Sequence, residues 1–231
     1  WVDKLNVQRN NIIIIANSKF SKRVIDDAYH VNSIVVHPGV DTKKYESNII
    51  VKKNQVVSIG AINKLKRHDF YIEVVASIPK DIRPTLVLIG NVCDNNYLEF
   101  LVSKSKRLSV NLKVFLNISE KKKIRKLHES KVFLFAPVSE PFGIVVEEAV
   151  AAGLPVIGYK YGGGYVEVLN NKIGKVVDVL NPAVWANQLM LILNNNDEIA
   201  KYSLRNTEYA KKNLNTDIMN EKILAIIQKH I

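Results

Sequence analysis

The sequence predicts an α/β protein built on a doubly wound parallel sheet. Short apolar runs rich in β-branched residues alternate with longer helical segments, which is the pattern of successive βαβ units. One such run, residues 131–137, is apolar enough to be a buried strand, and a loop, a helix and another apolar strand follow it. The chain has 231 residues, of which 47% are hydrophobic, so it can bury one or two cores.

The first elements form a short series that ends at a cluster of turn residues. We expect a strand at residues 11–15, a helix at 18–28 with Ser18 as its N-cap, and a strand at 33–36. The sequence His-Pro-Gly-Val-Asp at residues 37–41 then breaks the pattern.

A second and longer series of strands and helices begins at residue 55. The expected strands are residues 55–59, 85–89, 112–116, 131–137, 154–159 and 175–177. The expected helices are residues 69–78, 95–108, 120–129 and 144–152, with further helices from Pro182 to the end. In an open parallel sheet of this kind, ligands bind beyond the carboxyl ends of the strands, opposite helix N-termini.

The most informative stretch is residues 139–164, SEPFGIVVEEAVAAGLPVIGYKYGGG. Its helix starts after Gly143, so the amides there are unpaired and suit a phosphate or another anion. Glu140 and Glu148 flank that helix start and would repel a bare phosphate. Carboxylates do accept hydrogen bonds from sugar or ribose diols, so a nucleotide sugar satisfies both demands.

The neighbouring Glu147 is rotated by about 100° from Glu148 on a helix, so we expect only one of the two to face the site. The competing interpretation is that these are ordinary solvated helix residues. On the residues alone, the pair of carboxylates is a modest signal.

The E-x7-E pattern from Glu140 to Glu148 resembles the signature of the retaining glycosyltransferases of family 4. The segments Ala-Ala-Gly-Leu-Pro-Val-Ile and Gly-Gly-Gly-Tyr-Val-Glu that follow extend the resemblance. It implies a Rossmann-like, doubly wound parallel sheet, the C-terminal domain of a B-type glycosyltransferase, which holds the nucleotide-sugar donor. By position, Glu148 resembles the residue that binds the ribose hydroxyls, and Glu140 resembles the one that contacts the transferred sugar. The loop whose amides hold sugar and phosphates is matched by Phe142, Gly143, Ile144 and Val145.

The break at residues 37–41 resembles the linker between the two domains of that family. We therefore expect residues 1–40 to be the tail of the N-terminal acceptor domain with the linker, and residues 41–231 to be the donor domain. The chain is then interpreted as a fragment that lacks most of the acceptor domain, with an unusual short protein as the alternative. The C-terminal helix, from Asp217 on, is expected to cross back towards the N-terminal domain.

A second anchor follows the strand at residues 55–59. Gly60 allows close approach of a ligand to the backbone, and Lys66 would neutralise a diphosphate leaving group. The family usually has arginine directly after the glycine, where this sequence has Ala61. Arg67 or Lys64 is expected to compensate; the alternative is that they belong to a solvated basic turn.

A third and weaker set of contacts concerns the nucleobase. Asn117 and Ile118 follow the strand at residues 112–116, where the family reads the base, and Gly90 closes a strand at the same rim. A strand end followed by a turn has the same appearance without any ligand.

Charge and composition limit the other classes of function. The 33 basic and 22 acidic residues give a net charge of +11, but no nucleic-acid motif accompanies the basic run at residues 121–126. We interpret that run as a solvated helix, with peripheral contact to an anionic membrane as a secondary expectation. The histidines lack metal-ligand spacing, and the single Cys93 excludes an internal disulfide. A cytoplasmic protein without a membrane span, metal or cofactor is expected.

The resemblance implies hexosyl transfer from a UDP-, GDP- or ADP-sugar to an acceptor hydroxyl of a sugar or lipid-linked acceptor. Transfer would retain the anomeric configuration and need no metal, with Glu140 and Lys66 at the reacting centre. The alternative is a non-catalytic nucleotide-sugar-binding module or regulatory subunit. A glucosyl phosphorylase of the same fold is a third option, but it requires a pyridoxal-phosphate lysine region that we do not find.

Overall fold

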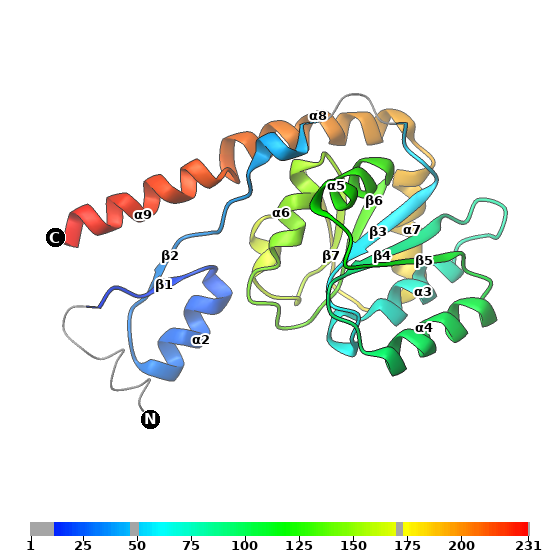
Figure 1. The fold of residues 1–231 in the computed structure, drawn as a ribbon, viewed down its shortest axis with the longest axis horizontal. Coiled ribbons are helices and arrows are strands. Elements are labelled where there is room, and N and C mark those ends of the chain that lie inside the picture. The colour runs from blue at the N-terminus through cyan, green and yellow to red at the C-terminus, as the bar shows by residue number, and fades with distance from the viewer. Residues whose placement is uncertain (1–11, 47–50, 170–172, 231) are drawn as a thin grey trace.

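The computed structural model describes residues 12–46, 51–169 and 173–230 (Figure 1). This part of the chain contains a two-stranded sheet and a six-stranded sheet, and every strand pair in both is parallel. The predicted α/β class with a parallel sheet is thereby confirmed. The small sheet pairs β1 (Ile15–Ala16) with β2 (Ile34–Val35) around helix α2 (Lys19–Tyr29).

The six-stranded sheet has the order β5-β4-β3-β6-β7-β8. From the middle of the sheet, β3, β4 and β5 follow one another towards one edge, and β6, β7 and β8 follow one another towards the other edge. The switch point therefore lies between β3 and β6, and it is there that open α/β sheets bind ligands. The strands are β3 (Gln55–Ile59), β4 (Thr85–Gly90), β5 (Leu112–Leu116), β6 (Val132–Phe135), β7 (Val156–Tyr159) and β8 (Gly174–Val177).

Helices cover both faces of this sheet, and each face has its own hydrophobic core. Successive strand residues point to opposite faces, so Val56 joins one core and its neighbour Val57 joins the other. One face is covered by α3 (His68–Ala76), α4 (Asn95–Arg107) and α7 (Pro182–Leu193). The other is covered mainly by α5 (Glu120–Glu129), α6 (Ile144–Ala151) and α8 (Asn196–Asn213).

Most predicted elements are confirmed, and the differences concern their ends. The expected strand at residues 154–159 begins only at Val156, because Pro155 has no N–H to donate to the ladder. The helix expected at residues 69–78 ends at Ala76, because Pro79 disfavours helical geometry at the residue before it. The strand expected at residues 11–15 is formed at Ile15–Ala16, where β2 offers partners; residue 11 lies outside the described part.

The N-terminal segment is fixed to the loop after β6. Ser18 caps α2, as predicted: its Oγ accepts a hydrogen bond from the Ser21 amide at 2.9 Å. The same Oγ donates to the Pro141 carbonyl at 2.6 Å. One hydroxyl thus joins the start of α2 to the residue that follows Glu140.

Glu167 makes the second connection to this segment. It ends the short 3₁₀ helix η3 (Gly164–Glu167), and its carboxylate accepts from the Lys19 and Phe20 amides at 3.0 Å each. His37 Nε2 lies 2.9 Å from the same carboxylate. An acidic group at a helix N-terminus stabilises both the free amides and the positive end of the helix dipole.

Glu167→Ala is expected to loosen α2 while leaving the large sheet intact. Loss of about 1 kcal/mol at the helix start should speed amide exchange in α2 by roughly fivefold. Hydrogen exchange measured by mass spectrometry checks this, with Glu208→Ala as the control, because Glu208 is exposed and its ion-pair partner among the described residues is Lys212 of the same helix. Unchanged exchange in α2 would contradict this role of Glu167.

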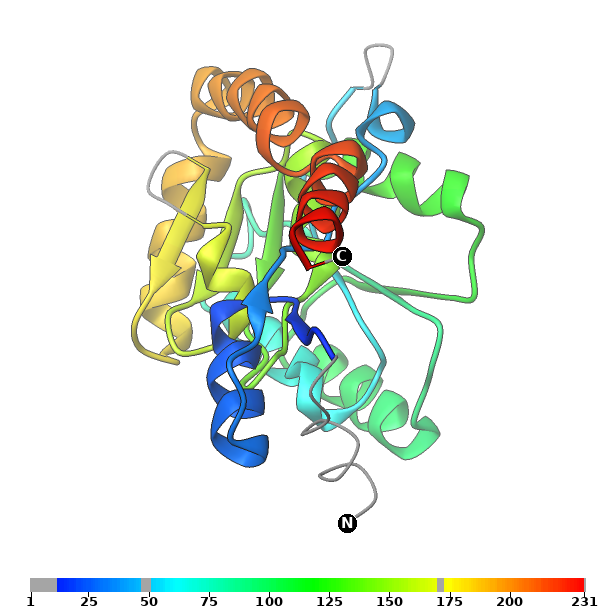
Figure 2. The same ribbon diagram turned by 90° about the vertical axis from the view of Figure 1, so that its left-hand side faces the viewer.

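The linker and the C-terminal helix run past each other. The Val40 amide donates to the Leu214 carbonyl at 2.8 Å, and the Thr216 amide donates to Val40 at 3.2 Å. A side chain on Gly39 would approach the Asn215 carbonyl oxygen to 2.7 Å, so the linker needs glycine at this position. Beyond this crossing, α9 (Thr216–His230) extends towards the end of the molecule that carries β1, β2 and α2, as expected (Figures 1 and 2).

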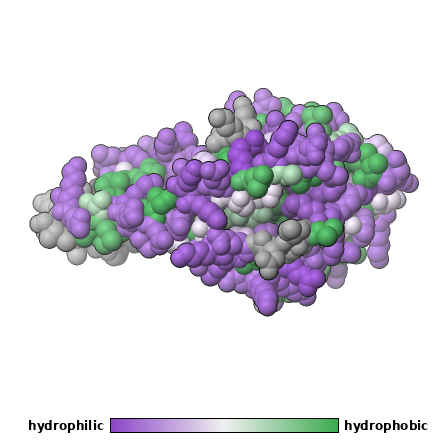
Figure 3. Space-filling view, turned by 90° about the horizontal axis from the view of Figure 1, so that it is seen from above, coloured by the Kyte–Doolittle hydropathy of each residue, from purple (hydrophilic) through white to green (hydrophobic). Residues whose placement is uncertain are grey.

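The surface of this protruding end is mixed rather than uniformly apolar. Figure 3 shows hydrophilic residues over most of the face seen from above, with separate hydrophobic patches on the protruding end and on the body. On α9, Leu224 and Ile227 are among the exposed apolar side chains. None of the helices in the described ranges has the length and apolarity to cross a bilayer.

Candidate functional site

A hollow of about 280 Å³ lies at the switch point of the sheet, beyond the carboxyl ends of β3 and β6. It brings together most of the side chains and loop residues predicted from the sequence. Predicted residues in its lining are Gly60, Lys66, Glu140, Phe142, Gly143, Ile144 and Val145. The remaining lining residues are Asn17, Pro38, Ile59, Phe135 and Pro141.

An ion pair between Lys66 and Glu140 spans the hollow. The two residues come from opposite sides of the switch point, Lys66 from the loop after β3 and Glu140 from the loop after β6. The stem of Lys66 lies against Gly60, where an added Cβ would approach Lys66 Cγ to 3.2 Å. Gly60 therefore lets the lysine fold over the strand end and reach the carboxylate.

A buried histidine supports the loop that carries Lys66. His68 is fully buried, and its Nε2 lies 3.0 Å from the Ala61 carbonyl oxygen. Burial lowers the pKa of His68 to about 4, so the ring is neutral near pH 7 and donates this hydrogen bond from Nε2. The peptide at Ala61 is thereby held in place.

The other two cations of this loop lie outside the hollow. Arg67 has a left-handed backbone with φ of 53°, which turns the chain into α3. Arg67 and Lys64 line a neighbouring hollow of about 480 Å³, together with residues of α3 and α4. The expected compensation for Ala61 by either residue therefore has no support in this arrangement.

The start of α6 presents its amides to the hollow. Gly143 precedes the helix with φ of 78°, and no side chain of the described residues caps this end. A Cβ at Gly143 would lie 2.9 Å from the Phe135 ring and 3.2 Å from Glu140 Cγ, so glycine is required twice over. The amides of the first helical turn lack intrahelical partners by geometry, and an anion is their natural acceptor.

The glycine run after β7 holds the backbone of Glu140. The Glu140 amide donates to the Gly162 carbonyl, and the Gly164 amide donates to the Glu140 carbonyl, both at 2.9 Å. Between them Gly163 has φ of 126°, and a Cβ there would lie 2.1 Å from the Glu140 oxygen. The predicted loop glycines thus position the carboxylate by a pair of backbone hydrogen bonds.

Glu148 lies one turn deeper on α6 and does not line the hollow. Its Oε1 accepts from Lys123 Nζ of α5 at 2.7 Å. Its Oε2 is buried and has no hydrogen-bond partner among the described residues. Burial first, and then the charge of Glu148 and a hydrogen bond to it, raise the pKa of Tyr45, a residue of the 3₁₀ helix η1 (Thr42–Tyr45) that packs in the same core.

Glu147 points the other way, in agreement with the expected rotation. Its side chain is fully buried, and neither oxygen has a hydrogen-bond partner in the described part of the chain. Burial, with a smaller contribution from the Glu148 charge, raises the pKa of Glu147 to about 9. This carboxyl is therefore protonated at neutral pH.

The predicted nucleobase residues form a rim at the ends of β4 and β5, outside the hollow. The Asn117 amide donates to the Gly90 carbonyl at 2.9 Å. A Cβ on Gly90 would approach the Gly60 oxygen to 2.7 Å, so these strand ends meet closely. Ile118 packs against the core beneath. The rim is continuous with Gly60, which does line the hollow.

Besides the strand-end and loop residues Ile59, Phe135 and Pro141, four residues near the site were not among the predicted ones. Asn17 and Pro38 line the hollow from the N-terminal segment, and sequence spacing gives no sign of that long-range contact. Tyr45 lies shortly after the linker and belongs to no sequence motif that would indicate a role in the site. Lys123 does carry a signal: it lies four residues before the buried Leu127, on the same face of α5.

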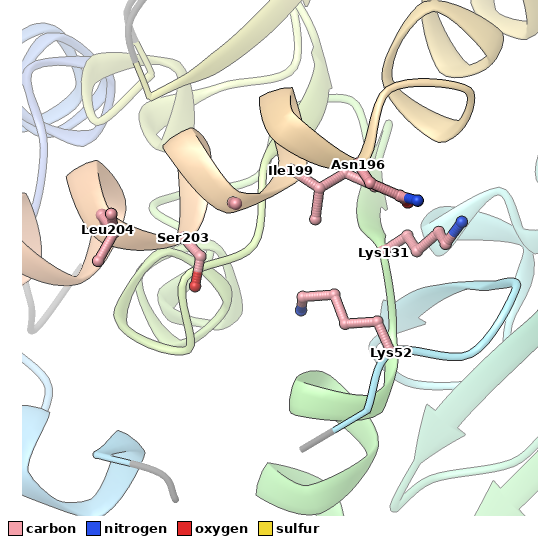
Figure 4. Close-up of a pocket in the computed structure, with 7 residues that line it drawn as sticks. Lys52, Lys131, Asn196, Ile199, Ser203 and Leu204 are labelled. Atoms are coloured by element: carbon pink, nitrogen blue, oxygen red, sulfur yellow. The ribbon is translucent and has the colours of Figure 1, made fainter. Parts of the chain in front are cut away.

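A separate hollow of about 650 Å³ lies under α8, at the amino ends of the strands (Figure 4). Lys52 and Lys131 line it, and both bind helix ends. Lys52 Nζ donates to the Ser130 carbonyl at 2.8 Å after α5, and Lys131 Nζ donates to the Leu193 carbonyl of α7 at 3.4 Å. Burial lowers the pKa of Lys52 to about 8. These contacts give both lysines a structural role.

Comparison with known sequences places the chain among glycosyltransferases. The family described as Glycosyl transferases group 1 matches residues 39–213. An alpha-1,2-mannosyltransferase of Xenopus tropicalis, named for GDP-Man and a dolichol-linked acceptor, is 28% identical over 68% of this chain and 35% of its own length. A D-inositol 3-phosphate glycosyltransferase of Mycobacterium sp. (strain KMS) is 27% identical over 69% of this chain and 39% of its own.

Solved structures show the same fold. Anabaena Alr3699/HepE, crystallised with UDP and glucose, has a TM-score of 0.84 at 18% identity, over 94% of this chain and 63% of its own. A glycosyltransferase of Rickettsia africae ESF-5 has a TM-score of 0.86 at 18% identity, over 99% of this chain and 67% of its own. The chain thus spans less than half of the two curated relatives and about two thirds of these structures. Its fold is that of the C-terminal part of B-type glycosyltransferases, and the chain belongs to the glycosyl transferases group 1 family.

Proposed function

We propose that this chain is the donor-binding part of a retaining glycosyltransferase. It binds a UDP-, GDP- or ADP-hexose and takes part in transfer of the hexose to a hydroxyl of a sugar or lipid-linked acceptor. The acceptor is presented mainly by a preceding domain, of which residues 1–40 are the tail, while residues 41–231 hold the donor. The protein works in the cytoplasm, in peripheral contact with an anionic membrane where the acceptor is lipid-linked.

One observation carries this proposal: the Lys66–Glu140 pair and the uncapped start of α6 line one hollow at the switch point. A diphosphate there receives the amides of Ile144 and Val145, and it attracts Lys66 away from Glu140. Glu140 is then free to accept hydrogen bonds from the hexose. Glu148, one turn along the same helix, accepts from the ribose hydroxyls, and the rim at Gly90, Asn117 and Ile118 holds the base.

In the proposed reaction the bond between the anomeric carbon and the β-phosphate oxygen breaks. The acceptor oxygen bonds to the same face of the anomeric carbon, and its proton passes to the departing phosphate oxygen. Lys66 and the α6 amides stabilise the charge on the leaving diphosphate. The negative charge of Glu140 stabilises the positive charge that develops on the sugar ring.

A second candidate is a nucleotide-sugar-binding module without turnover. It is favoured by Ala61 at the family's arginine position, because Lys64 and Arg67 line the neighbouring hollow instead. Lys66 is then the one cationic side chain in the lining of the switch-point hollow, among the residues that the structure describes. Donor binding without any release of nucleoside diphosphate, even with acceptors supplied, would support the module.

Calorimetric titration of the chain with UDP, GDP and ADP tests donor binding. We expect one of the three to bind more tightly than its own nucleoside, since the diphosphate supplies the contacts at α6. Lys66→Met should weaken that nucleotide by at least about tenfold, the size of a lost charge-assisted contact. Lys64→Met is the matched control from the same turn and should change affinity less than twofold. If no diphosphate binds, or if both variants behave alike, the proposal fails.

A further inference from the structure

Lys123 differs from the other lysines of the basic run on α5 because its ammonium contacts a residue of the candidate site. Its ammonium lies 2.7 Å from Glu148 Oε1, and the two side chains are only 20% and 13% exposed. Lys122 and Lys126 instead place their ammonium groups over the Phe115 ring, at 5.5 and 5.0 Å from its centroid, and Lys126 also pairs with Glu129 of its own helix at 2.8 Å. The run that we interpreted as a solvated helix thus contains one residue directed at the candidate site.

The surroundings of Glu148 make this lysine necessary. Glu147 beside it is a carboxyl, Tyr45 belongs to the apolar core next to it, and Glu148 Oε2 is buried without a hydrogen-bond partner in the geometry of the described residues. A buried carboxylate without a counter-charge is costly and is not held in one orientation. Among the ion pairs of the described residues, Glu148 pairs with Lys123 and with no other cation.

The ion pair leaves Glu148 with spare hydrogen-bonding capacity. A carboxylate has about four acceptor positions, of which Lys123 uses one and the Tyr45 hydroxyl interacts with another. Lys123 in turn has three N–H donors, and one hydrogen bond, to Glu148, is found for it in the described part of the chain. The pair can therefore bind a vicinal diol from both sides: the carboxylate accepts from the hydroxyls, and the ammonium donates to their oxygens.

We propose that Lys123 is the positioning residue for the donor's ribose and that it makes nucleotide affinity depend on the 2′- and 3′-hydroxyls. This inference rests on the proposed function, in which Glu148 binds the ribose. Lys123 fixes the Glu148 carboxylate in its charged and oriented form. Because α5 begins directly after the rim at Asn117 and Ile118, this helix connects the Lys123–Glu148 pair to the residues proposed to hold the base.

The test compares a ribonucleotide with its 2′,3′-dideoxy analogue. The nucleoside diphosphate that binds best, and its dideoxy form, are titrated into wild type, Lys123→Met, Lys123→Arg and Lys121→Met. Lys121 is the matched control, because it is exposed on the same helix. Thermal melting of each variant checks that it remains folded.

We expect wild type to prefer the ribonucleotide by roughly tenfold or more, the effect of losing hydrogen bonds to a charged group. Lys123→Met should lose most of that preference, weakening the ribonucleotide about tenfold and the dideoxy form less than twofold. Lys123→Arg should keep the preference, and Lys121→Met should match wild type.

An equal loss for both nucleotides in Lys123→Met, which a merely structural lysine would give, overturns the inference. So does an unchanged preference in that variant, or a wild type that does not distinguish the two forms. These outcomes leave the proposed function standing, because the nucleotide still binds. Failure of every nucleoside diphosphate to bind wild type overturns both.

Discussion

Glu140→Gln is expected to reduce release of nucleoside diphosphate from the nucleotide sugar at least about 100-fold, while donor affinity changes less than threefold. The substitution keeps the size of the side chain and its backbone contacts with Gly162 and Gly164, but it removes the negative charge. That charge matters most in the transition state, where positive charge develops on the sugar ring, so the rate suffers far more than binding. The rate is measured with a saturating donor, with the acceptor supplied.

Glu120→Gln serves as the control for this experiment. Glu120 is 54% exposed at the start of α5 and pairs only loosely with Lys44, at 3.4 Å. Its replacement should leave both rate and affinity within twofold of wild type. If the Glu140→Gln protein releases nucleoside diphosphate at the wild-type rate, the assignment of Glu140 to the reacting centre is wrong.

Glu147→Gln is expected to stabilise the protein above pH 5, by an amount that grows with pH. The pKa of Glu147 is about 9 in the folded chain and has its ordinary value of 4.5 when the chain unfolds. Between these two values the unfolded chain releases a proton that the folded chain keeps. The free energy of unfolding of wild type therefore falls by up to about 1.4 kcal/mol for each pH unit. Glutamine does not titrate, so this fall in the free energy of unfolding is absent from the variant.

Urea unfolding from pH 5 to pH 8.5 measures the effect. The two proteins should be nearly equal in stability at pH 5, and the variant should be the more stable one at pH 8.5. Among the described residues, the Glu148 charge contributes to the raised pKa of Glu147, and the pKa of Tyr209 of α8 is raised by burial and secondarily by Glu147. Parallel stability curves would show that Glu147 is not the buried acid described above.

Sequence patterns predicted the fold well because strands and helices leave different signals: the strands are short apolar runs, and the helices are longer segments with start and stop residues. The ends of β3, β5 and α5 agree with the expected residues. Errors occur where a local feature ends the pairing early, as Pro155 does before β7. The two-stranded sheet is shorter than expected, because its length depends on partners far along the chain rather than on the apolar run itself.

The site was predictable as far as it follows from one βαβ motif. Glu140, Gly143 and the amides after it come from a single loop, and Lys66 lies at the neighbouring strand end. The direction of Arg67 was not predictable, because it depends on a left-handed backbone at a residue other than glycine. Asn17 and Pro38 reach the hollow only through tertiary docking of the N-terminal segment.

The burial of Glu147 and Lys123 depends on which helix covers which face. Both are residue types whose charges normally face water, so residue type alone does not predict their burial. Lys123 gains its place from its spacing to Leu127, and Glu147 from the packing of α6 against α8. The spacing of Lys123 to Leu127 is visible in the sequence, but its contact with Glu148 and the burial of Glu147 follow only from the assembled layers.

A crystal structure of the chain with the nucleoside diphosphate that binds best tests the central claim most directly. We predict the diphosphate within hydrogen-bonding distance of the Ile144 and Val145 amides and of Lys66 Nζ, with the ribose hydroxyls on Glu148. A nucleotide bound elsewhere, for example under α8 beside Lys52 and Lys131, with Glu140 and Glu148 untouched, would contradict the account.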